Sequence, residues 1–247
     1  MQAGGDNGSS RRPAAPSRSW IVRLAHALNL LCLVVLFMSG LQIFNAHPAL
    51  YWGEASDLDA PLAAIEATWT ETGDQVATAT LFGHAVETTG LLGWTWRKGE
   101  LDPAAFPAWL TIPNRQDLAT GRVWHFAFAW LLVANGLAYL LHLLVRRRWA
   151  RDFRAPGAYG PAQRAVYLAV VFLALPAMVA TGLCMSPAIL VIAPWLADLF
   201  GGRQSARTLH FLLAWSLAAF TLVHGLLALR SPGRLGAMIF GRGGGAR

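Results

Sequence analysis

The chain has 247 residues, 55% of them hydrophobic and only 13% charged, whereas soluble domains carry roughly 25% charged residues, so the composition indicates that lipid is its solvent. The net charge of +7 does not indicate nucleic-acid binding, because the arginines stand at the ends of apolar runs, where membrane topology explains them. Cys32 and Cys184 each stand alone in an apolar run without a CxxCH motif, which argues against covalent haem and against a cysteine-bound metal cluster.

The first predicted elements are a polar tail and a spanning helix. Residues 1–19 are rich in Gly, Ser, Pro and Arg and are expected to form a disordered cytoplasmic tail. Residues 20–44 form an apolar run that is long enough to cross a bilayer, which takes about 20 residues. The run is too long for a signal peptide and contains His26, so a retained helix is expected.

A long polar segment, 45–121, separates this helix from the next. It holds most of the acidic residues of the chain, together with several tryptophans and prolines. None of its apolar runs is long enough to span a bilayer. The segment is expected to be a periplasmic loop, and loops of this length are usually functional.

Three further spanning helices are expected, over residues 122–145, 165–184 and 206–230. They are joined by the connections 146–164 and 185–205, and the chain ends in a tail, 231–247. Within the second connection, the stretch from Pro187 to Phe200 is expected to lie along the outer membrane interface. The predicted fold class is therefore all-α: an integral membrane four-helix bundle with one long periplasmic loop.

Arginine clusters predict the orientation of this bundle. Clusters precede the first helix, follow the second and follow the fourth: Arg11, Arg12, Arg18 and Arg23; Arg146, Arg147, Arg148, Arg151 and Arg154; Arg230, Arg234, Arg242 and Arg247. An excess of Lys and Arg marks the cytoplasmic side of a membrane. Both termini and the 146–164 connection are therefore expected on the cytoplasmic side of a bacterial inner membrane, with the 45–121 and 185–205 segments in the periplasm.

Five of the seven histidines fall in the predicted spanning helices, where ionisable residues are rare and usually functional. Depth pairs four of them: His125 and His210 near the outer ends, His26 and His224 near the inner ends. His224 follows His210 by 14 residues, just under four turns, so both imidazoles point from nearly one face at depths about 21 Å apart. Two imidazoles suit the iron of a b-type haem, whereas zinc would need all its ligands close together. The sequence therefore predicts two non-covalent b-type haems.

Three arginines stand three residues before one of these histidines, one turn nearer the water: Arg23, Arg122 and Arg207. A guanidinium at this position could pair with a haem propionate. The alternative is an interfacial anchor, which explains Arg23 well and the two arginines on the outer side poorly.

Two glycines lie on the same helix faces as the histidines, at the level of the opposite haem. Gly40 follows His26 by 14 residues, and Gly136 follows His125 by 11 residues. A missing side chain there would let a porphyrin approach the backbone. Helix packing explains both glycines equally well.

The remaining histidines have less specific interpretations. His142 lies 17 residues after His125, about 100° around the helix, so it should not face the same way. It could be a packing residue, a proton donor at a quinone site or a spare ligand, and the first two are favoured. His47 and His84, in the outer segment, are expected to face solvent or a partner. A single intramembrane histidine could be a packing residue or a proton relay, but two depth-matched pairs favour cofactor binding.

Three stretches carry a resemblance to a known family: RLAHALNLLCLVVLFMSGLQI (23–43), GRVWHFAFAWLLVANGLAYLLHLL (121–144) and GGRQSARTLHFLLAWSLAAFTLVHGLL (201–227). They resemble the bacterial cytochrome b561 and nickel-hydrogenase cytochrome b superfamily, which includes b subunits of hydrogenases, formate dehydrogenases and thiosulfate-reductase-like enzymes. The resemblance covers most of residues 20–240. It implies four helices around two b haems, with ligands at the positions of His26, His125, His210 and His224. It also implies quinone chemistry near the membrane surface, although no motif fixes the quinone site.

The predicted function is a di-haem membrane subunit that passes electrons, in either direction, between a periplasmic partner and the quinone pool. The partner would be an oxidoreductase containing molybdenum or another metal, docked on 45–121 and 185–205. One alternative is a self-contained superoxide:quinone or ferric reductase of the same fold, against which the long outer segment argues mildly. Another is a haem-free transporter or scaffold, against which the scarcity of polar groups other than histidine argues. Lipid is the solvent in each case, and a homo-oligomer is one form that the chain could take.

Overall fold

The structure, a computed structural model, describes residues 20–145 and 160–241. The predicted disordered tail 1–19 and the arginines at 146–154 lie outside the described residues. Four long helices are present, each long and apolar enough to cross a membrane, as predicted. They are α1 (Trp20–Phe44), α2 (Leu118–Val145), a third built from α4 (Pro161–Ala169), the π-turn η2 (Val170–Ala174) and α5 (Leu175–Leu183), and α8 (Arg203–Leu229). The protein is therefore a multi-pass membrane protein.

The third helix contains a π-turn for a local reason. Pro176 stands at the start of α5, where it has no N–H to donate and its ring would collide with a carbonyl one turn back. The wider π-turn directly before it, η2, accommodates the proline while the helix continues.

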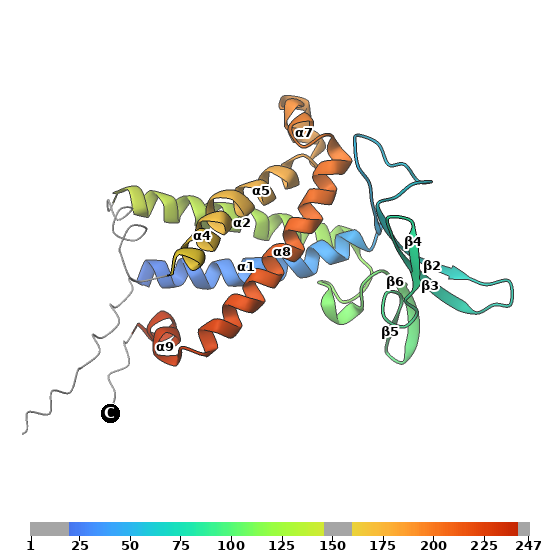
Figure 1. The fold of residues 1–247 in the computed structure, drawn as a ribbon, viewed down its shortest axis with the longest axis horizontal. Coiled ribbons are helices and arrows are strands. Elements are labelled where there is room, and N and C mark those ends of the chain that lie inside the picture. The colour runs from blue at the N-terminus through green and yellow to red at the C-terminus, as the bar shows by residue number, and fades with distance from the viewer. Residues whose placement is uncertain (1–19, 146–159, 242–247) are drawn as a thin grey trace, which may run out of the picture.

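The helices α1 and α2 run side by side, and α8 crosses them obliquely (Figure 1). Midway along the pair, the amide of Asn135 donates hydrogen bonds to Asn29 Oδ1 at 2.8 Å and to the Ala25 carbonyl at 2.9 Å. Nearer the strands, a Cβ on Gly121 would lie 2.9 Å from Gln42 Cγ. Small residues and interhelical amide bonds are the usual means of close packing in a bilayer.

The segment between α1 and α2 folds into strands, so the all-α prediction is wrong for this part of the chain. The first four strands form an antiparallel sheet in the order β1-β2-β3-β4, and the last two form a hairpin. Their bounds are β1 (Ala49–Leu50), β2 (Ala63–Trp69), β3 (Gln75–Leu81), β4 (His84–Glu87), β5 (Gly93–Arg97) and β6 (Glu100–Ala104). A short 3-10 turn, η1 (Ala108–Leu110), follows. These strands are too short to be identified as membrane-spanning segments. The residues of their turns are the clearer sequence indication of strands.

Two of the hairpins have two-residue turns in which both residues adopt positive φ. They are Phe82-Gly83, between β3 and β4, and Lys98-Gly99, between β5 and β6. Paired positive φ angles are characteristic of tight turns whose twist matches that of antiparallel strands.

The strands gather at one end of the spanning helices, and the short helix α9 (Pro232–Phe240) lies at the other (Figure 1). These are called the sheet end and the α9 end below. Two more short helices, α6 (Pro187–Ile192) and α7 (Trp195–Leu199), join α5 to α8 at the sheet end. A buried apolar cluster connects the end of α1 to the strand segment: Leu41, Phe44, Leu50, Ala105 and Phe106.

The strand segment is also bonded to the start of α8. The Gly53 carbonyl accepts hydrogen bonds from the backbone N–H groups of Gln204 and Ser205, at 2.9 and 3.2 Å. The carboxylate of Glu54 accepts one from the Arg203 N–H at 2.9 Å. A helix N-terminus presents N–H groups without helical partners and favours negative charge, so this loop caps α8. The strand segment therefore holds the sheet ends of α1 and α8 together.

Candidate functional site

The first pair of membrane histidines meets near the sheet end. His125 on α2 and His210 on α8 face each other with ring centres 6.2 Å apart and planes inclined by 63°. Both side chains are half-buried. This is one of the two pairings that depth along the helices predicts.

A hydroxyl and a glycine from α1 surround His125. Ser39 is fully buried, and its Oγ lies 3.1 Å from His125 Nδ1 while also donating to the Val35 carbonyl at 2.6 Å. A Cβ built on the next residue, Gly40, would lie 3.3 Å from His125 Cε1. The glycine at this position therefore makes room for the imidazole.

A second hydroxyl and glycine surround His210 in the same way, this time from α5. Thr181 is fully buried, its Oγ1 lies 3.1 Å from His210 Nδ1, and it donates to the Ala177 carbonyl at 2.7 Å. His210 Nδ1 is also 3.1 Å from the Met178 carbonyl. A Cβ on Gly182 would lie 3.2 Å from His210 Cε1.

The second pair meets toward the α9 end. His26 on α1 and His224 on α8 have ring centres 6.0 Å apart, inclined by 48°. Both are more exposed than the sheet-end pair. Phe220, one turn before His224, stacks on its ring at 5.6 Å and 20°. This is the second pairing that depth predicts.

The spacing within each pair matches two axial ligands on one iron. An imidazole nitrogen binds a first-row metal at about 2 Å, so two rings on opposite sides of one ion have their centres about 6 Å apart. Both pairs have this spacing, at 6.2 and 6.0 Å. Within the part of the chain that the structure describes, no group of three or more His, Cys, Asp and Glu side chains is placed to hold a metal ion. A ligand set of two imidazoles, with the other positions supplied by a porphyrin, fits this arrangement.

Aromatic side chains lie along α8 between the two levels. Trp215 meets Phe37 of α1 edge-on, with ring centres 5.0 Å apart. Phe211 and Phe106 lie 6.2 and 6.1 Å from the same indole. These contacts pack α8 against α1 and against the strand segment.

The three arginines predicted beside the histidines have other contacts. Arg23 donates hydrogen bonds to the carbonyls of Met238, at 3.0 Å, and of Ile239, at the end of α9. Cationic side chains are favourable at a helix C-terminus, so this contact ties α9 to the start of α1. A propionate would have to share the guanidinium with these carbonyls.

The two arginines at the sheet end differ from each other. Arg207 donates to the His47 carbonyl and lies 5.7 Å from the centre of the Phe44 ring. Arg122 is exposed and lies 5.6 Å from the centre of the Phe126 ring. Arg122 therefore has the more open guanidinium of the two, and the propionate role stays a prediction for all three arginines.

The predicted glycines also differ from each other. Gly40 lies at the level of the sheet-end pair, but the group against it is the ring of His125. A Cβ on Gly136 would meet no atom within 4 Å among the described residues. Ser39, Thr181 and Gly182 were missed. The signal that could have found them is a hydroxyl residue followed by glycine, in two different spanning helices.

His142 stands apart from both pairs. Its Nε2 is buried, and no hydrogen-bond partner for it occurs among the described residues. A buried imidazole nitrogen without a partner is costly, so a water or a ligand is its natural complement. Its role as a packing residue or as a proton donor near a quinone stays a prediction.

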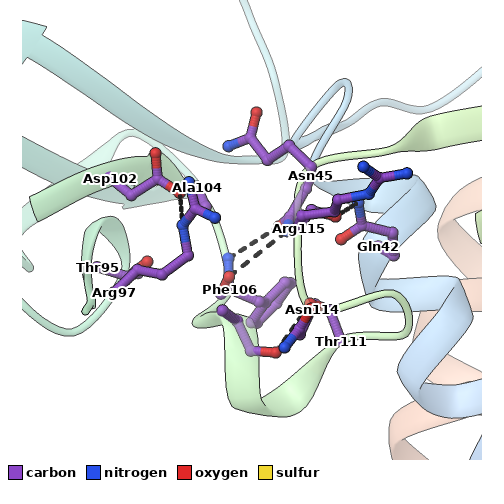
Figure 2. Close-up of a pocket in the computed structure, with 12 residues that line it drawn as sticks. Gln42, Asn45, Thr95, Arg97, Asp102, Ala104, Phe106, Thr111, Asn114 and Arg115 are labelled. Atoms are coloured by element: carbon purple, nitrogen blue, oxygen red, sulfur yellow. Dashed lines mark hydrogen bonds and ion pairs between the residues drawn. The ribbon is translucent and has the colours of Figure 1, made fainter.

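A polar pocket lies between the end of α1 and the strand segment (Figure 2). The amide of Gln42 donates to the Arg115 carbonyl at 2.7 Å, and Asn45 exchanges hydrogen bonds with the Phe106 backbone. Arg97 pairs with Asp102 at 2.6 Å. The cavity holds about 10 Å³, which is room for about one water. It is a joint between the bundle and the strands and is too small for a quinone.

Comparison with known proteins gives two matches. Residues 17–241 match the family described as prokaryotic cytochrome b561. A protein of Azospira oryzae, named provisionally as the YedZ1 subunit of a protein-methionine-sulfoxide reductase, is 34% identical over 140 residues, covering 48% of this chain and 69% of the relative. No solved structure matches the chain significantly.

Proposed function

The chain belongs to the prokaryotic cytochrome b561 family, whose members are membrane proteins that bind b-type haem and transfer electrons, and from that premise we propose that it is a di-haem subunit. It passes electrons between a partner on the sheet side of the membrane and the quinone pool on the other side. The sheet end is periplasmic in this proposal.

The observation that carries the proposal is the repetition of one geometry at two levels. Two histidine pairs, His125 with His210 and His26 with His224, each have ring centres about 6 Å apart. The shared helix α8 contributes one ring to each pair, 14 residues apart. Packing alone gives no reason for the same ring spacing at both levels, whereas one iron between each pair does.

In this proposal His125 and His210 hold one haem, and His26 and His224 hold the other. A bound haem supplies a one-electron iron couple whose potential depends on its axial ligands and their hydrogen bonds. The chain fixes the height and orientation of each imidazole. The apolar side chains of the bundle give each haem iron a surrounding of low dielectric constant, which favours the less charged oxidation state of the haem.

The strand segment supports a protein partner on the periplasmic side. It is joined to α1 by a buried apolar cluster and to α8 by backbone hydrogen bonds, so it offers a defined surface in place of a loose loop. That surface exposes large apolar side chains, among them Trp52, Phe82, Trp96 and Trp109. Exposed apolar groups of this size on an ordered domain favour protein contact. The relative whose name describes it as a reductase subunit also favours a partner enzyme over a self-contained one.

The arginine distribution supports the orientation. The arginine clusters at both ends of the chain and after α2 support a cytoplasmic location for the α9 end, by the positive-inside rule. The quinone site is then proposed at the α9 side, near the His26 and His224 pair. His142, with its buried Nε2, is the candidate proton donor there.

A reconstituted system tests this function. Purified protein in liposomes is mixed with a quinol analogue, and the b-type α band is followed in the absence and presence of a periplasmic redox partner. We expect quinol to reduce the chain, and an oxidised partner to reoxidise it. A chain that turns over superoxide and quinone by itself, with no partner, would instead favour the self-contained reductase. A chain without any b-type band would favour the transporter or scaffold.

A further inference from the structure

The two sheet-end imidazoles are held by the same motif on two different helices. Ser39-Gly40 on α1 holds His125, and Thr181-Gly182 on α5 holds His210. In each case a buried hydroxyl oxygen is 3.1 Å from the ring Nδ1, and the glycine that follows lies under the ring Cε1.

We propose, on the basis of the di-haem function above, that Ser39 and Thr181 are positioning residues that fix the tautomer of the two sheet-end histidines and thereby set the redox potential of that haem. Each hydroxyl accepts a hydrogen bond from Nδ1–H, which leaves the Nε2 lone pair of each ring for iron.

The direction of these hydrogen bonds follows from counting protons. A hydroxyl has one proton, and a carbonyl has none. Ser39 Oγ lies 2.6 Å from the Val35 carbonyl, and Thr181 Oγ1 lies 2.7 Å from the Ala177 carbonyl, so each hydroxyl proton is donated there. The contact of the same oxygen with Nδ1 then requires the proton to be on the ring nitrogen.

A second acceptor on the His210 ring gives the same answer. His210 Nδ1 lies 3.1 Å from the Met178 carbonyl. A carbonyl can only accept, so Nδ1 of this ring is the donor. Two acceptors for one N–H restrict rotation of the His210 ring more than one would.

The glycines complete the arrangement. A Cβ at residue 40 or 182 would lie 3.3 or 3.2 Å from Cε1 of the ring, closer than an ordinary van der Waals contact, and would push the imidazole away from the hydroxyl. Hydroxyl and glycine therefore act together, because the first orients the ring and the second lets it approach the helix.

The ordinary explanation of such hydroxyls is local. Serine and threonine in membrane helices often donate to the carbonyl one turn back, and Ser216 and Thr221 on α8 do so at 2.8 and 2.7 Å. That accounts for the hydroxyl proton of Ser39 and Thr181. It does not account for the hydroxyl oxygen meeting a histidine Nδ1 on a neighbouring helix twice, each time with glycine next in sequence.

The chemical consequence concerns the iron. A hydrogen bond from Nδ1–H makes the imidazole a stronger electron donor, and second-shell partners of this kind typically change metal affinity by about 10- to 100-fold. A stronger donor favours ferric over ferrous iron. Removing a hydroxyl should therefore shift the ferrous-to-ferric preference of the sheet-end haem by about tenfold toward ferrous, which is about 59 mV upward for a one-electron couple.

The test is a potentiometric titration of full-length protein with paired variants. Thr181→Val removes the hydroxyl at nearly constant volume, and Thr181→Ser keeps the hydroxyl but removes a methyl group. Ser39→Ala and Ser39→Thr form the second pair. Ser216→Ala and Thr221→Val are the controls, because each removes a hydroxyl whose hydrogen bond, among the described residues, is to a carbonyl of its own helix.

We expect the midpoint of the sheet-end haem to rise in Thr181→Val and Ser39→Ala, with wild-type midpoints in Thr181→Ser, Ser39→Thr and both controls. The low-spin ferric electron paramagnetic resonance signal of the same haem should shift in the same two variants. Loss of that haem alone from Thr181→Val, with retention in Thr181→Ser, also supports the proposal.

The proposal would be overturned if the ferrous-to-ferric preference of the sheet-end haem changed less than twofold in both Thr181→Val and Ser39→Ala. An equal shift of its midpoint in the two control variants would also overturn it. So would equal defects in Thr181→Val and Thr181→Ser, because residue 181 would then act by packing. A wild-type chain with fewer than two haems would instead refute the proposed function, so the two failures are distinguishable.

Discussion

The imidazole rings of His125 and His210 lie with their centres 6.2 Å apart, although they stand on helices that the chain connects through the whole of the third spanning segment. The strand segment helps to bring them together, because it is bonded both to the end of α1, which packs along α2, and to the start of α8. The sheet-end site is therefore built by the bundle and the strand segment jointly.

Substituting single histidines should remove one haem at a time. His125→Ala and His210→Ala each delete an axial ligand of the sheet-end pair, so we expect one haem per chain to remain, with the properties of the other. His26→Ala and His224→Ala should have the reverse effect. Haem extracted per chain, with the reduced-minus-oxidised spectrum, measures this. His84→Ala, in the exposed strand β4, is the control and should keep both. Loss of a haem from His142→Ala would contradict the assignment of the α9-end pair.

Larger side chains at Gly182 and Gly136 should show whether each glycine makes room for a histidine ring or for a porphyrin. A branched side chain at Gly182 would meet the His210 ring, so Gly182→Val should lower the occupancy of the sheet-end haem and leave the other intact. Gly136 has open space beside it among the described residues, where the sequence predicts an approaching porphyrin. Gly136→Val should then lower occupancy at the α9 end only. Full occupancy of both haems in Gly136→Val would show that this glycine serves helix packing.

The joint between the strand segment and α8 should depend on Gly202. A Cβ there would lie 2.5 Å from the Gly53 carbonyl carbon, and its φ is +110°. Gly202→Ala combines a backbone collision with strain, so we expect destabilisation of at least about 1–3 kcal/mol, together with faster proteolysis within 45–121. Gly201→Ala is the matched control, because Gly201 also has positive φ but its Cβ would lie 3.7 Å from the nearest atom, Ser205 Oγ. Equal effects of both variants would argue that strain alone matters.

Acidification should weaken the contact between the strand segment and α8 through His47. Burial, and then the charge of Arg207, lower the pKa of His47 below its ordinary 6.5. The unfolded chain therefore takes up a proton at His47 more readily than the folded chain does. The contribution of His47 to the free energy of unfolding is present above about pH 6.5 and is lost as the pH falls below that value. Thermal unfolding of the purified protein between pH 7.5 and 5 measures this. His47→Gln should reduce the dependence on pH, and an unchanged profile would remove His47 as its source.

The helices and the histidine pairs could be predicted because their signals are local. Apolar runs of spanning length identify the four helices, and helical geometry places His210 and His224, 14 residues apart in the sequence, on nearly one face of the last helix. The strands were missed because the 45–121 segment was judged only by the length of its apolar runs, none of which can span a bilayer, and their clearest signals were the turns Phe82-Gly83 and Lys98-Gly99. Attention to two-residue turns ending in glycine would have weakened the all-α prediction.

The residues that orient the imidazoles could not be predicted in this way. Ser39 and His125 are 86 residues apart in the chain, and Thr181 and His210 are 29 apart. Their contacts depend on which faces of neighbouring helices meet, which is a tertiary property. Gly40 shows the same limit, because helical spacing predicts only its level on α1, while the group against it, the ring of His125, depends on how α1 and α2 pack.

If two histidine pairs hold two b-type haems in one chain, the haem content of the purified full-length protein must show both. Haem should be quantified per polypeptide after extraction and assigned to two components by redox titration. We expect two non-covalent haems per chain with separate midpoints. A chain that carries one haem or none, when purified intact and supplied with haem during expression, would contradict this expectation.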